Sequence, residues 1–201
     1  MLRQLGLPSM WFVGYTALRC SRKHMLSVKR DLVLALDSPW TAMPPLRLGK
    51  IPAGLGTADL FVTISDDDRP LLRVDLYADC SGPFQDTVVW AEHVFVGVER
   101  LVYVIDPKRA FASEIFLDSD AWGYFGHFYA DHEYLLIASA TALLRLAPDG
   151  NVMWNRSDLG LDGVVVNSVE DGLIKGEGCW DPDEEWKPFL LRLDSGELII
   201  G

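Results

Sequence analysis

The chain contains the stretch Trp90-Ala-Glu-His-Val-Phe-Val96, which recurs 39 residues later as Tyr129-Ala-Asp-His-Glu-Tyr-Leu135 and after another 39 as Ser168-Val-Glu-Asp-Gly-Leu-Ile174. Each copy places a small or β-branched residue, an acid, and His or Asp ahead of the start of an apolar strand. A further strand follows each copy, at 101–105, 142–146 and 188–193, and ends in a turn that contains Asp. In the third unit, an insertion at 179–186 separates the two strands.

A fixed period of this length is typical of repeat proteins, in which each unit must stack on a neighbour to bury its apolar face. Propeller blades of four short strands have about this length. Three units are fewer than the roughly four to eight that close a ring. We therefore expect residues 26–88 to supply one or two degenerate blades, or the sheets to stack without closing. The predicted fold is all-β, a small or incomplete β-propeller-like repeat of antiparallel sheets, with an irregular N-terminal extension. If the ring closes, we expect an N-terminal strand to complete the last unit.

One segment adds a family resemblance to this prediction. The sequence Leu143-Leu-Arg-Leu-Ala-Pro-Asp-Gly-Asn-Val-Met-Trp154 is echoed by Leu190-Leu-Arg-Leu-Asp-Ser-Gly-Glu-Leu198. It resembles the strand, turn, strand and Trp pattern of quinoprotein-like (PQQ-like) β-propeller repeats, over roughly residues 88–201. The resemblance implies that Trp154 docks one blade on the next. The first unit lacks both this Trp and the glycine of the turn.

The N-terminal part of the chain divides less regularly. Residues 1–25 form a basic, apolar extension, which we expect to be disordered or outside the fold, and residues 26–201 form a single domain (26–88 divergent strands, 89–201 three units). The apolar stretch at 5–18 is shorter than the ~20 residues that span a bilayer as a helix. An organellar leader, or a true start at Met25, are alternatives. Within 26–88 we predict a strand at 31–36, a loop at 41–57 that contains Pro44, Pro45 and Pro52, and a hairpin.

The predicted hairpin pairs 58–64 with 71–77 around the acidic tip at 65–70. In its second arm, apolar residues alternate with polar ones, the period of two expected when one sheet face is buried. We therefore expect Arg73, Asp75 and Tyr77 to face solvent. The acids of the tip are interpreted as turn residues, because Asp hydrogen-bonds to its own backbone there.

The distribution of charge bears on possible partners. The first 30 residues hold six basic side chains and no acid, whereas residues 31–201 carry 12 basic and 29 acidic ones, a net charge of −17. Because nucleic-acid affinity comes from Lys and Arg that neutralise phosphates, nucleic acid and anionic membranes are poor partners, and a basic protein is a favourable one. The three cysteines lack a C-x-x-C spacing, which favours a reducing, cytoplasmic location. Cys80 and Cys179 are the pair to test for a disulfide.

Two of the histidines could bind a metal ion together with nearby acids. His127, Asp131, His132 and Glu133 contain ligand types for zinc or another divalent ion. Positions i and i+5 of a strand lie on opposite faces, however, and His132 is equivalent in the repeat to His93 and Asp171. We therefore favour a role in turns and predict no metal or other cofactor.

The insertion in the third unit is the sharpest local feature. Its candidate binding residues are Trp180, Asp181, Asp183, Glu184, Glu185 and Trp186. Two tryptophans that frame an acidic loop are a plausible contact surface, because Trp is enriched at binding hot spots and loops carry recognition. The alternatives are a calcium loop, which lacks the EF-hand pattern, and a solvated loop whose tryptophans pack on the core. The aromatic residues between Phe111 and Tyr134 are interpreted as core rather than as a ligand cleft.

No catalytic residue is assigned, because the chain contains no nucleophile elbow, phosphate loop, dinucleotide fingerprint or H-E-x-x-H motif. The first hypothesis is a non-catalytic protein-interaction module, of the immunity or scaffold type, that binds a basic partner. The alternative is a propeller-type enzyme or small-ligand binder with a cleft or metal site at the strand ends. It requires several side chains to converge in one pocket, among them Glu92, His93, Asp131, His132, Glu170 and Asp171.

Overall fold

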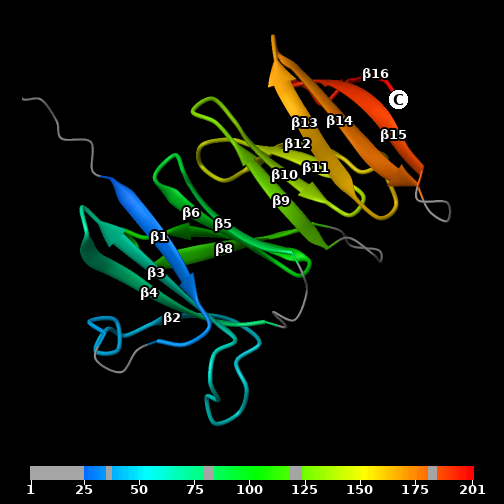
Figure 1. Ribbon diagram of the computed structural model, residues 1–201. Coiled ribbons are helices and arrows are strands. Elements are labelled where there is room, and N and C mark those ends of the chain that lie inside the picture. The colour runs from blue at the N-terminus through cyan, green and yellow to red at the C-terminus, as the bar shows by residue number, and fades with distance from the viewer. Residues whose placement is uncertain (1–24, 35–37, 79–83, 118–123, 181–184) are drawn as a thin grey trace, which may run out of the picture.

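Four four-stranded sheets make up the fold. The computed structural model describes residues 25–34, 38–78, 84–117, 124–180 and 185–201, and these contain strands and no helix. Figure 1 shows the sheets in chain order, from sheet A (β1–β4) at the lower left to sheet D (β13–β16) at the upper right. The first strands of successive sheets are neighbours, β1 with β5, β5 with β9 and β9 with β13. The prediction of an all-β, propeller-like fold is confirmed.

Sheets B, C and D are antiparallel meanders in which every strand pairs with the next one along the chain. Sheet B comprises β5 (Gln85–Trp90), β6 (His93–Val98), β7 (Leu101–Asp106) and β8 (Phe111–Phe116). Sheet C comprises β9 (Phe125–Ala130), β10 (Leu135–Ser139), β11 (Leu143–Leu146) and β12 (Val152–Arg156). Sheet D comprises β13 (Val164–Glu170), β14 (Leu173–Trp180), β15 (Glu185–Arg192) and β16 (Leu198–Ile200). Sheet D thus obtains its fourth strand from β16, and the predicted completion by an N-terminal strand is wrong.

The 39-residue motif marks the same place in each sheet, the turn between the first and second strands. In sheet B this turn consists of Ala91 and Glu92, with φ values of 48° and 67°; in sheet D it consists of Asp171 and Gly172, with φ values of 52° and 74°. Two consecutive residues with positive φ form the type I′ turn, whose twist matches that of paired strands. Asp67 and Asp68 make the same turn at the predicted hairpin tip.

Sheet A is the divergent unit, with the strand order β1-β3-β4-β2. Its hairpin of β3 (Leu60–Asp66) and β4 (Arg69–Tyr77) was predicted, but its two edge strands were not. β1 (Leu26–Asp31) lies earlier in the chain than the predicted strand at 31–36, because Leu26 and Val28 alternate toward the core, whereas Ser27 and the charged residues after Val28 are exposed. Residues 35 and 36 of the predicted strand lie outside the described residues. β2 (Leu46–Gly49) lies within the predicted loop and pairs with β4 in parallel.

The second face of sheet A is covered rather than solvated, so that part of the prediction is wrong. Residues of the 38–57 segment pack over it and contact its side chains. The Arg73 guanidinium donates two hydrogen bonds to the Asp75 carboxylate, at 2.7 and 2.8 Å, and a third to the Trp40 carbonyl at 3.2 Å. The Tyr77 hydroxyl donates to the Leu55 carbonyl at 3.3 Å. The cover supplies hydrogen-bond partners for Arg73 and Tyr77, and Arg73 supplies those of the buried Asp75.

Three hydrophobic clusters hold the sheets together, one between each pair of successive sheets. Val94 and Val96 of β6 face sheet A, whereas Phe95 between them faces sheet C. The inner sheets are buried on both faces for this reason, and their central strands are nearly continuous apolar runs. Within the described ranges, no hydrophobic cluster joins sheet D to sheet A.

Two tryptophans dock sheets on their neighbours. The Trp90 indole N–H donates to the Asp131 carbonyl of the next sheet at 2.7 Å. The Trp154 indole N–H donates to the Leu193 carbonyl at 2.9 Å, and Trp154 packs against the cluster between sheets C and D. Trp154 therefore docks one sheet on the next, as the repeat resemblance implies for this residue.

Candidate functional site

A cavity of about 710 Å³ lies between sheets A and B. Its floor is the face of sheet B that carries Leu101 and Tyr103 on β7 and Glu114 and Phe116 on β8. The strand register pairs Leu101 with Phe116 and Tyr103 with Glu114. Since paired residues share a face, all four side chains lie on the cavity side. Phe116 is 68% exposed, which is unusual for a large apolar side chain next to a core.

The opposite wall is built by the end of β2. Gly49 has φ +87°, and a Cβ at this position would lie 2.1 Å from the Tyr77 carbonyl oxygen, so only glycine fits the turn. The next residue, Lys50, donates its backbone N–H to the same carbonyl at 2.8 Å. β2 thus ends after four residues and leaves the outer part of sheet B without an opposing strand, which creates the cavity.

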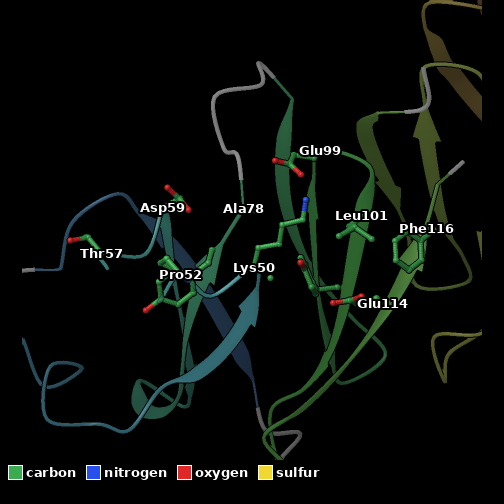
Figure 2. Close-up of a pocket in the computed structure, with 12 residues that line it drawn as sticks. Lys50, Pro52, Thr57, Asp59, Ala78, Glu99, Leu101, Glu114 and Phe116 are labelled. Atoms are coloured by element: carbon green, nitrogen blue, oxygen red, sulfur yellow. The ribbon is translucent and has the colours of Figure 1, made fainter. Parts of the chain in front are cut away.

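The charged residues of the cavity are mostly acidic. Asp59, Glu99 and Glu114 face it with one basic residue, Lys50. Figure 2 shows the Lys50 side chain extending from the end of β2 toward sheet B, with Glu99 on one side and Glu114 on the other. Within the part of the chain that the structure describes, no ion pair involves these four side chains. Three carboxylates against one amine give the cavity a net negative charge.

This arrangement suits a ligand group with an apolar stem and a cationic end. The side chains of Leu101 and Phe116 can cover a methylene chain, as Lys and Arg stems commonly lie on apolar surface. A cation beyond the stem would meet the carboxylates, and it could also lie against the exposed Phe116 ring. The cavity therefore offers both apolar surface and carboxylates to a basic side chain.

The predicted binding loop is only partly described, and the two tryptophans that frame it lie on opposite faces of sheet D. Asp181, Asp183 and Glu184 lie outside the described residues. The register pairs Trp180 with Glu185, and Cys179 with Trp186, so the two indoles lie on opposite faces of sheet D. The Lys187 amine lies 5.8 Å from the centre of the Trp180 ring, whereas Trp186 is 45% exposed. Cys80 is also outside the described residues, so its predicted pairing with Cys179 stays a prediction.

The candidate metal ligands are divided between two places. His132 contacts Asp131 and Glu133 in the turn after β9, whereas His127 packs edge-on against the rings of Phe84 and Tyr129. Contact with His132 lowers the pKa of the Asp131 carboxyl, chiefly through a hydrogen bond from the His132 backbone. Among the described residues, no three His, Cys, Asp or Glu side chains are grouped so that they could hold a metal ion.

The side chains needed by the enzyme alternative do not gather in one pocket. They lie at or next to the first turn of sheets B, C and D. Two of the glutamates form ion pairs, each with a different lysine. Glu92 pairs with Lys108 at 2.7 Å, and Glu170 pairs with Lys175 at 3.3 Å. The Glu92 carboxylate raises the pKa of Lys108 through this hydrogen bond.

The aromatic residues between Phe111 and Tyr134 include both core and surface positions. Phe125 is fully buried between sheets B and C, as predicted, whereas Phe111 is 61% exposed. Tyr124 stacks on Phe84, with 5.8 Å between ring centres, and its hydroxyl donates to the Asp162 carboxylate at 2.8 Å. Burial, and then this hydrogen bond, raise the pKa of Tyr124 to about 12.

The raised pKa predicts a pH-dependent contribution to stability. Because the folded-state pKa of Tyr124 exceeds the ordinary value of 10.0, this contribution is complete below pH 10 and is lost as the pH rises to about 12. The near-ultraviolet titration of tyrosine ionisation should therefore include a group that ionises near pH 12. This group should be absent in Tyr124→Phe and should move to lower pH in Asp162→Asn. An unchanged curve in both variants would contradict the assignment.

None of the charged cavity residues was singled out from the sequence. They come from four separate segments, and Lys50, Asp59, Glu99 and Glu114 follow no common spacing. The one available signal was Phe116, an aromatic residue that belongs to the predicted aromatic group but lies on an outer strand.

Comparison with known proteins gives no family for the chain. No protein-family model matches it, and no curated protein matches it significantly. A solved structure with similarity is the crystal structure of BBS1N in complex with ARL6DN, soaked with mercury, with 13% sequence identity and a TM-score of 0.44. The alignment covers 69% of this chain and 43% of that one, so this chain spans less than half of its length. The four sheets themselves define a propeller-like all-β protein.

The described ranges contain no helix that is both long enough and apolar enough to cross a membrane.

Proposed function

We propose that this chain is a non-catalytic protein-interaction module that holds a lysine or arginine side chain of a basic partner in the cavity between sheets A and B. The observation that carries the proposal is the lining of the cavity, in which Asp59, Glu99 and Glu114 outnumber Lys50 above an apolar floor. The net charge of −17 over residues 31–201 would attract the same partner at long range. An immunity-type or a scaffold protein would use such a surface.

The test measures binding of a synthetic peptide, about eight residues long, in which lysine alternates with threonine and valine. Calorimetry would compare the wild type with the cavity variant Asp59→Asn/Glu99→Gln/Glu114→Gln. Three partly exposed ion pairs contribute about 2 kcal/mol together, so we expect affinity to fall roughly 30-fold.

The matched control removes three acids far from the cavity, Glu133→Gln/Glu170→Gln/Asp194→Asn. It changes the net charge equally, so we expect only a small loss of affinity from the weaker long-range attraction. Equal losses in the two variants would contradict the proposal, because binding would then depend on net charge alone.

Substitution of Lys50 should change the peptide affinity in the opposite direction. Its amine competes with the ligand for the same carboxylates, so Lys50→Gln should strengthen peptide binding about threefold. Weaker binding by this variant would show that the peptide cation is held elsewhere.

A further inference from the structure

β8 is an edge strand that borders the acidic cavity. It is the last strand of sheet B in the order β5-β6-β7-β8. Large apolar side chains at both of its ends are exposed, Phe111 at 61% and Phe116 at 68%. An exposed apolar edge offers a row of backbone groups to another strand, and native proteins usually protect such edges with charges, bulges or a cover.

The hydrogen bonds between β7 and β8 show which backbone groups of β8 point away from β7. The Leu117 N–H donates to the Arg100 carbonyl at 3.0 Å, so these two residues form a hydrogen-bonded pair. Such pairs alternate with non-bonded ones along an antiparallel ladder, and the register runs without a shift from Leu101–Phe116 to Asp106–Phe111. The backbone N–H and C=O groups of Ala112, Glu114 and Phe116 therefore point away from β7, toward the free edge.

The same alternation places the side chains. Glu114 and Phe116, whose backbone groups point to the free edge, carry their side chains on the cavity side of the sheet. In a strand added to this edge, every second side chain would lie on that side. Those side chains would be next to Phe116 and Glu114, and the side chains between them would lie on the other face, with Ile115.

The other outer strands do not combine these properties. β16 has only three residues. On β12, Arg156 already pairs with Asp158 at 2.5 Å, and β2 carries Arg47 and is followed by Lys50. Charge complementarity for a basic segment is therefore found at β8.

We propose that the partner binds as an extended segment that adds to β8 as a fifth strand of sheet B, with a lysine or arginine at every second position directed into the cavity. This inference rests on the proposed function and specifies how the partner is held. Strand addition of this kind derives affinity from backbone hydrogen bonds and specificity from alternate side-chain sites.

The test uses the alternating lysine peptide in two N-methylated forms and the wild-type protein. One form is methylated on the amides of the lysines, and the other on the amides of the residues between them. Only one of these sets can face β8, the lysine set for antiparallel addition and the intervening set for parallel addition. We expect methylation of that set to weaken binding about 30-fold, because several backbone hydrogen bonds are lost, and methylation of the other set to change it less than about threefold.

The outcomes separate this inference from the proposed function. Equal effects of the two methylations, or no effect of either, would overturn strand addition. If the cavity variant nevertheless weakens binding of the unmethylated peptide, the cavity still holds a basic side chain without a paired backbone. Equal losses of peptide affinity in the cavity variant and in its control would overturn the proposed function itself.

Discussion

Gly178→Ala is expected to lower the free energy of unfolding by about 4 kcal/mol, close to the upper end of single-substitution effects. A Cβ at position 178 would lie 1.6 Å from the Leu159 carbonyl oxygen and 2.6 Å from its carbon. The obstacle is backbone, which cannot rotate away as a side chain tip can. The segment that links sheets C and D would have to lift off β14.

That movement would break specific contacts. Leu161 donates its N–H to the Cys179 carbonyl at 2.7 Å, and Cys179 donates to the Gly163 carbonyl at 2.8 Å. Leu159, which is 4% exposed, would leave the cluster between sheets C and D. Thermal denaturation followed by circular dichroism should show a melting temperature lowered by roughly 10 °C.

Gly56→Ala is the matched control. Its added Cβ would meet only the side chain of Pro52, at 3.1 Å, on an exposed loop, so we expect a melting temperature within about 2 °C of the wild type. If Gly178→Ala melted equally close to the wild type, the close approach of the Leu159 backbone to β14 would be refuted.

The second large effect is expected at the buried ion pair of sheet A. Arg73→Met should cost about 3–5 kcal/mol, because it leaves the Asp75 carboxylate buried without its cation. The side chain of Asp75 is only 7% exposed, and that of Arg73 is 15% exposed. Arg73 also holds the covering segment through the Trp40 carbonyl, and its guanidinium lies 5.5 Å from the centre of the Phe61 ring. Urea denaturation of the variant would measure the loss.

The double variant Arg73→Met/Asp75→Leu separates the two contributions of this arginine. Replacing both charges by apolar groups removes the uncompensated carboxylate, so we expect it to recover more than about half of the loss. A double variant that is as unstable as Arg73→Met alone would show that the hydrogen bond to Trp40 dominates instead.

Turns and strand alternation, which depend on neighbouring residues, could be predicted from the sequence. Contacts with distant segments of the chain could not. The turn motif at Ala91-Glu92 and at Asp171-Gly172 indicated the repeat correctly, because two-residue turns between paired strands have a strong residue preference. Alternation in β4 correctly indicated the buried face that carries Val74. It gave the wrong surroundings for Asp75, because a period of two shows that residues share a face but not which distant segment covers it.

The edge strands and the site were missed for related reasons. β1 contains Lys29 and Arg30 and buries only one side, so its apolar signal is weak. β2 depends on parallel pairing with β4, and parallel partners are distant in the chain. The cavity in turn exists because β2 is short, a consequence of pairing that no spacing of Glu99 and Glu114 could reveal.

The successive packing of the sheets has a consequence for how the molecule opens. Each hydrophobic cluster joins only two adjacent sheets, so stability is the sum of nearest-neighbour terms, as in a one-dimensional chain of coupled units. Sheet A has a second cover in the 38–57 segment, whereas sheet D is joined through sheet C. Amide protons of β14 and β15 should therefore exchange with solvent through partial unfolding that leaves β3 and β6 protected, rather than through global unfolding of the whole array.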